Sequence, residues 1–113
     1  MDEHLDHEAL AELREVMEED FETLLGTYLN DSRMRISALA DAAEAGNPEL
    51  YARTAHSLKG SCINIGAMRL GQLCAGAERT GRSGDLGGAQ KDLQVIQSEF
   101  EIVAEQLNSY IHH

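Results

Sequence analysis

The sequence predicts an all-α fold, an antiparallel four-helix bundle with a short additional N-terminal helix. Apolar residues recur at steps of three and four along most of the chain, which is the spacing of one helix face. The 113 residues include a single Pro, and no useful stretch shows the alternation of a strand. This length is enough for one hydrophobic core, so we expect a single domain over residues 1–113, with the bundle core at about 20–110.

The first two helices differ in length and in role. A short helix over about 5–19 should cap one end of the bundle, with Leu10, Leu13 and either Val16 or Met17 on its inner face. A long helix should follow over about 20–45, and Gly46 can end it. The core-facing residues expected on this long helix are Phe21, Leu25, Tyr28, Ser32, Ile36, Leu39 and Ala43.

A clear start signal opens the third helix. Asn47 can accept a hydrogen bond from the first helical turn, and Pro48 fits the first helical position, where its missing N–H costs nothing. The helix should run to about residue 64, and Gly66 belongs to a break that follows it. Its expected inward face is Tyr51, Ala55, Leu58, Cys62 and Ile65.

Two further helices complete the bundle. One is expected over about 67–82, and it is separated from the next by the only obvious loop, residues 81–88. The last is expected over about 89–110 and has the most regular pattern of the chain. The expected inward residues of the two helices are Leu70, Leu73 or Cys74, Ala77, Leu93, Ile96, Phe100, Val103, Leu107 and Tyr110.

The charge of the chain is uneven. The formal net charge is −11, which argues against nucleic acid and anionic membrane surfaces as partners. Residues 51–82 nevertheless carry five Lys or Arg against the single acid Glu78. This basic stretch suggests a site that handles an anion, although ordinary surface arginines would give the same count.

Other features bound the class of protein. Cys62 and Cys74 fall at apolar positions, so we expect buried free thiols rather than a disulfide scaffold. The acidic N-terminus and the lack of a long apolar run predict a cytoplasmic protein with no membrane segment. His4 and His7 are expected to be solvated, and His112 and His113 could be native or the remnant of a tag.

His56 is the candidate reactive residue of the third helix. It lies outside the apolar face and shares the outward surface with positions 52, 53, 59, 60 and 63. A neutral imidazole is a competent nucleophile near pH 7, and Lys59 at i+3 could stabilise charge on a phosphoryl group. Gly60 at i+4 costs about 0.5–1 kcal/mol relative to Ala inside a helix, and access for a bulky partner to the imidazole would explain it.

The second ring nitrogen of such a histidine benefits from an acceptor that fixes its tautomer. No acid shares the face of His56, but the following helix offers Glu78. The other interpretation of Glu78 is an i,i+4 ion pair with Arg82, worth a few tenths of a kcal/mol.

The run Ala55-His56-Ser57-Leu58-Lys59-Gly60-Ser61, followed by Gly66-Ala67, resembles the signature of histidine-phosphotransfer (HPt) domains. The close match covers about residues 50–82, and the flanking helices match in length and periodicity only. Five downstream features also fit the pattern of that family: Leu70, Leu73, Cys74, Glu78 and the pair Gly81-Arg82.

The resemblance implies a phosphorelay carrier. His56 would accept a phosphoryl group on Nε2 from the aspartyl-phosphate of a receiver domain and pass it to another receiver. Lys59 would match the phosphate-proximal cation, Gly60 the access glycine, and Glu78 the position where the family has Gln or Glu on the histidine ring. The chain would bind no cofactor, because the Mg²⁺ and the carboxylate pocket belong to the receiver.

We expect the partners to be receiver domains of response regulators or hybrid sensor kinases, bound by a free-standing, monomeric protein. The expected contact residues for the receiver are Arg53, Ile63, Met68, Arg79 and Arg82. A helical interaction module that binds signalling domains without carrying phosphate is the alternative. The chain has no Gly-rich nucleotide loop, so we do not expect it to act as a kinase, and it lacks the inward Glu-x-x-His pairs of a di-iron bundle.

Overall fold

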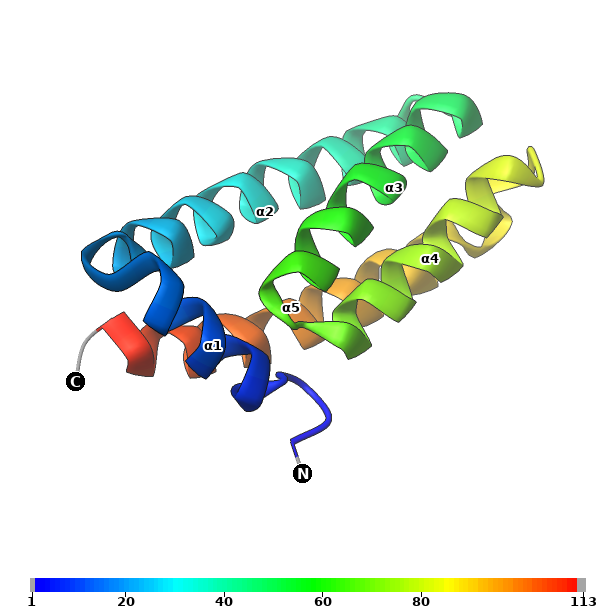
Figure 1. The fold of residues 1–113 in the computed structure, drawn as a ribbon. Coiled ribbons are helices and arrows are strands. Elements are labelled where there is room, and N and C mark those ends of the chain that lie inside the picture. The colour runs from blue at the N-terminus through cyan, green and yellow to red at the C-terminus, as the bar shows by residue number, and fades with distance from the viewer. Residues whose placement is uncertain (1, 112–113) are drawn as a thin grey trace.

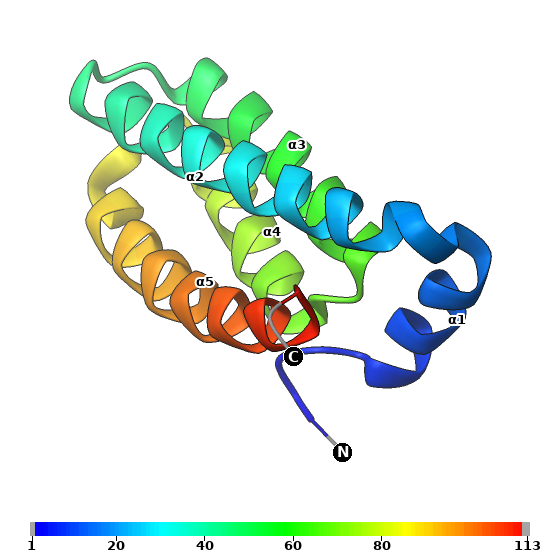
Figure 2. The ribbon, with the colours of Figure 1, turned by 90° about the vertical axis from the view of Figure 1, so that its left-hand side faces the viewer.

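The computed structural model describes residues 2–111 and consists of helices joined by short connections. Figure 1 shows four of them as the bundle, each antiparallel to the next: α2 (Phe21–Glu44), α3 (Pro48–Ile65), α4 (Met68–Arg82) and α5 (Ala89–Ile111). The short α1 (His7–Met17) lies across one end, as both Figure 1 and the turned view in Figure 2 show. Two single-turn 3₁₀ helices, η1 (Glu18–Asp20) and η2 (Leu86–Gly88), precede α2 and α5. The predicted all-α bundle is confirmed.

The helices begin and end for local reasons. The side chain of Asn47 accepts a hydrogen bond from the N–H of Leu50 at 3.1 Å, and Pro48 occupies the first turn of α3, as predicted. Asp6 caps α1 in the same way, through the N–H of Ala9 at 3.0 Å. Gly66 ends α3 with a φ of 88°, a left-handed conformation that glycine adopts without steric cost. This turn fixes the direction in which α4 leaves α3.

The core follows the predicted faces closely. Where the pattern left a choice, Met17 packs against the core while Val16 is exposed, and Cys74 is fully buried while Leu73 is half-buried. Both cysteines are free and buried. Residue 43 was expected in the core, but Ala42 is the buried alanine at that end of α2, and Ala43 is half-buried against it.

One predicted orientation on α3 is wrong. Ala52, expected beside His56 on the outward surface, is only 6% exposed because α4 covers it. Gly81 makes this contact possible. A Cβ added at position 81 would lie 2.7 Å from the backbone nitrogen of Ala52 and 2.8 Å from the carbonyl oxygen of Pro48. The helices α3 and α4 therefore approach so closely here that no side chain fits between them.

The N-terminal segment is also attached more firmly than expected. Leu5 is buried, and the backbone N–H of Asp6 donates to the carbonyl of Gly66 at 2.9 Å. His4, expected to be solvated, places its Nδ1 2.6 Å from the buried carboxylate of Glu99, which holds the pKa of His4 above its ordinary value. His112 and His113 lie outside the described residues. Within residues 2–111, no helix is long and apolar enough to cross a membrane.

The close contact at Gly81 leads to a prediction about stability. Gly81→Ala should lower the free energy of unfolding by about 1–3 kcal/mol, because the methyl group would overlap the backbone of α3. Urea unfolding followed by circular dichroism measures the change. Gly60→Ala is the matched control, since a Cβ at this exposed helical position has nothing within 4 Å. It should raise stability by about 0.5–1 kcal/mol, and equal effects of the two substitutions would refute the packing argument.

Candidate functional site

His56 lies on α3 with its ring 62% exposed, and one ring nitrogen is fixed by α4. Its Nδ1 is 3.1 Å from Oε2 and 3.2 Å from Oε1 of Glu78. An ionised carboxylate can only accept hydrogen bonds, so Nδ1 must carry the proton and donate it. The lone pair then belongs to Nε2, for which residues 2–111 supply no hydrogen-bond partner. This arrangement presents an exposed, nucleophilic nitrogen.

Glu78 is the buried centre of the cluster, with only 7% of the residue exposed. Oε2 accepts two hydrogen bonds from Arg82, at 3.0 Å from Nε and 2.6 Å from Nη2, and Oε1 accepts one from Lys59 Nζ at 3.0 Å. The donors on Arg82 lower the pKa of Glu78 most, and Lys59 and His56 lower it further. Together they outweigh the opposing effect of burial and bring the pKa to about 2. The carboxylate is therefore ionised at neutral pH.

Glu78 unites both interpretations that the sequence left open, because it bonds the ring of His56 and pairs with Arg82 at i+4. No pattern in the sequence indicates that Glu78 is buried. Arg82 was expected as a contact residue for a partner, and its place on Glu78 is a finding of the structure.

Lys59 and Gly60 lie one turn beyond His56 on the same helix. Lys59 bonds Glu78 with its ammonium group, and its side chain is partly exposed. Gly60 is exposed, and no part of the described chain occupies the space that a side chain there would take. Internal packing therefore does not explain the glycine, which leaves access to His56 as the expected reason.

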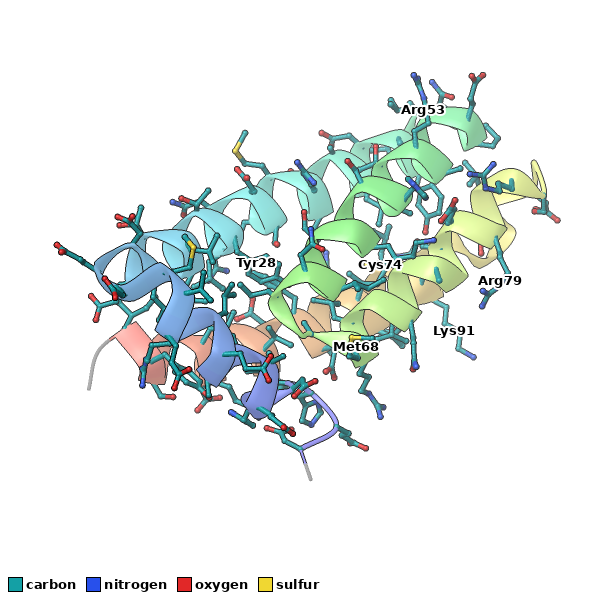
Figure 3. The ribbon with its side chains drawn as sticks, in the orientation of Figure 1. Tyr28, Arg53, Met68, Cys74, Arg79 and Lys91 are labelled. Carbon is teal, nitrogen blue, oxygen red and sulfur yellow. The ribbon has the colours of Figure 1, made fainter. Side chains whose placement is uncertain are left out.

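The other expected contact residues lie along the exposed α3–α4 face. Arg53 and Arg79 lie toward the end remote from α1, and Met68 lies at the opposite end (Figure 3). Ile63 is exposed near the end of α3 and packs against α4, since a Cβ at Gly71 would be 3.2 Å from its Cγ1. The expected basic contacts Arg53 and Arg79 thus lie toward one end of this face and the expected apolar contacts Ile63 and Met68 toward the other.

Sequence reasoning missed one cation beside this face. Arg35 on α2 donates to the carbonyl of Ser57 at 3.2 Å and to the hydroxyl of Ser61 at 3.1 Å. The arginine is half-buried between α2 and α3. No local pattern predicts this contact, because 22 residues separate Arg35 from Ser57. In the described part of the chain, no three His, Cys, Asp or Glu side chains gather so as to hold a metal ion.

The fold and this cluster together define a helical-bundle protein with an exposed, oriented histidine. The sequence model of the Hpt domain family matches residues 23–108, and the chain belongs to this family. It is therefore a histidine-containing phosphotransfer protein of a phosphorelay, a phosphoryl shuttle that is not itself an enzyme, and the family implies receiver domains as partners.

Among solved structures, the chain is similar to histidine-containing phosphotransfer protein B (HptB) from Pseudomonas aeruginosa PAO1. The two are 37% identical in sequence and superimpose with a TM-score of 0.93, covering 96% of this chain and 94% of that one. The comparison with curated proteins yields no match.

The low pKa of Glu78 predicts how stability depends on pH. The folded-state pKa of about 2 lies below the ordinary value of 4.5, so the ionised carboxylate stabilises the fold above pH 4.5. This contribution is lost as the pH falls from 4.5 toward 2. Glu78→Gln should lower the free energy of unfolding at pH 6, on the order of 1–3 kcal/mol, and should flatten its decline over the acid range.

Urea unfolding of both proteins at half-unit steps from pH 6 to pH 2.5 tests this expectation. Carboxylates common to both proteins contribute equally to the two curves, so the difference between the curves isolates Glu78. Parallel curves across the acid range would contradict the assignment.

Proposed function

We propose that His56 is the residue that carries the phosphoryl group. It would accept the group on Nε2 from the aspartyl-phosphate of one receiver domain and pass it to the aspartate of another. The observation that supports this proposal is the hydrogen bond from Nδ1 to Glu78, which leaves the lone pair on the exposed Nε2. No other histidine of the described chain combines an exposed ring with a buried carboxylate: His4 is mostly covered, and His7 bonds Asp2, which is only half-buried.

The transfer step would form one bond and break another, with His56 as the acceptor. The Nε2 lone pair of His56 forms a bond to phosphorus, and the bond between phosphorus and the aspartyl oxygen breaks, so the receiver carboxylate leaves with that electron pair. The proton on Nδ1 stays in place, and the ring gains positive charge, which Glu78 offsets through its hydrogen bond with Nδ1. Transfer to the next receiver reverses these bond changes.

Two neighbours of His56 would assist the reaction in different ways. Lys59 would leave Glu78 and stabilise the negative charge on the phosphoryl oxygens, as a cation does in other phosphoryl transfers. Gly60 would leave room for the receiver to reach the ring. The Mg²⁺ that phosphoryl transfer between these domains requires would come with the receiver.

The exposed α3–α4 face would receive the partner. Its basic end, with Arg53 and Arg79, would attract the acidic site of a receiver, while Ile63 and Met68 would supply apolar contacts at the other end. A monomer in the cytoplasm suffices for this role, because His56, Lys59 and Glu78 all come from one chain.

Labelling with a phosphorylated receiver domain and Mg²⁺ tests the assignment of His56. The wild type should acquire acid-labile, base-stable label, as expected of phosphohistidine, and His56→Gln should acquire none. His7→Gln, which removes another exposed histidine, should label like the wild type. Lack of label on the wild type across a panel of receivers would reject the proposal and favour a module that only binds.

Lys59→Ala tests the role of the lysine. The substitution should lower the transfer rate at saturating receiver by about tenfold or more, the effect of losing one charge-stabilising group. The receiver concentration at half-saturation should change less than twofold, because the lysine would act mainly in the transition state. Rapid-quench transfer kinetics provide both values. An equal change in both would make Lys59 a docking residue instead.

A further inference from the structure

Arg82 binds the oxygen of the Glu78 carboxylate that Lys59 does not bind. It is the last residue of α4 and lies one helical turn beyond Glu78. Its Nε and Nη2 both donate to Oε2, whereas the ammonium of Lys59 donates to Oε1. The two cations therefore use different oxygens of one buried carboxylate, and they come from different helices.

The proposed transfer makes conflicting demands on Lys59. In the resting protein its Nζ neutralises Glu78, but the phosphoryl group on His56 would need the same ammonium group. If Lys59 were the only cation on Glu78, its departure would leave a buried carboxylate without a counter-charge, which is costly. Glu78 would then either retain the lysine or lose its orientation toward the ring.

Arg82 removes this conflict. Its bonds to Oε2 lie within α4 and do not depend on α3, where His56 and Lys59 are located. They can persist while Lys59 turns away. Nδ1 of His56 lies 3.1 Å from Oε2 and 3.2 Å from Oε1, so the arginine holds one of the two oxygens that orient the ring.

We propose that Arg82 is a positioning residue, which keeps Glu78 oriented toward His56 and thereby frees Lys59 to serve the phosphoryl group. The inference rests on the proposed roles of His56 and Lys59. It differs from the expectation that Arg82 contacts the receiver, although its side chain is 66% exposed and could do so.

A double-mutant cycle separates these two roles. Arg82→Gln should lower the transfer rate at saturating receiver by about fivefold to tenfold, because Lys59 becomes the sole cation on Glu78 and is retained there. The half-saturating receiver concentration should stay within about twofold of the wild type. In a Glu78→Gln background, the neutral amide needs no counter-charge, so adding Arg82→Gln should change the rate less than about twofold.

Two further variants serve as controls. Arg82→Lys keeps the charge at position 82 and should recover part of the rate. Lys91→Gln removes an equal charge from α5, outside the cluster, and should leave the rate unchanged. A rise in the half-saturating receiver concentration with Arg82→Gln in both backgrounds would overturn the inference, and so would an equal fall in rate in both.

A spectroscopic measurement tests the inference without any phosphoryl group. In the ¹⁵N NMR spectrum at pH 8, His56 of the wild type should be mainly the Nδ1–H tautomer, and Arg82→Gln should raise the share of the Nε2–H tautomer. An unchanged tautomer ratio would overturn the inference. If the wild type failed to take up label, the proposed function would be rejected on that ground, and the ring measurement would still decide whether Arg82 positions Glu78.

Discussion

The buried carboxylate of Glu78 is the constraint on which the site depends. A charge with so little exposure must be neutralised by its neighbours, since it cannot be hydrated as a surface acid is. Lys59, Arg82 and the ring of His56 meet this need from two helices. The same contacts that satisfy the acid also hold the imidazole, so the burial of the acid and the orientation of the ring rest on one set of hydrogen bonds. The four side chains form one connected hydrogen-bond network with the carboxylate at its centre.

The rest of the bundle holds α3 and α4 in the positions that this cluster requires. Gly66 sets the turn between them, and Asp6 from the N-terminal segment is hydrogen-bonded to that turn. At the other end, Gly81 lies directly against Ala52. Further along α3, Cys62 is fully buried and bonds the hydroxyl of Tyr28 across to α2. The exposed ring of His56 thus lies on a helix that is packed against its neighbours along its length.

Much of this architecture could be predicted because it depends on local pattern. The start of α3 at Asn47-Pro48 and the outward placement of His56 both follow from spacing along one helix. The contacts that were missed link different helices. The burial of Ala52 depends on how closely Gly81 approaches, and the Arg35–Ser57 contact depends on how α2 is rotated. Periodicity encodes neither the separation nor the rotation of two helices. The pairing of Glu78 with His56 could therefore be predicted from the sequence, whereas the burial of Glu78 could not.

The contact between Gly81 and Ala52 also determines the spacing of α3 and α4, on which the hydrogen bond between His56 and Glu78 depends. This contact lies one helical turn from both His56 and Glu78. Nδ1 of His56 is 3.1 Å from Oε2 and 3.2 Å from Oε1 of Glu78. A hydrogen bond is effectively lost beyond about 3.5 Å, so the spacing of the two helices has only about 0.3 Å of freedom before the ring is released. Gly81 therefore sets the helix spacing that this hydrogen bond requires. A methyl group added at position 81, far from any reacting atom, would change the alignment of the imidazole.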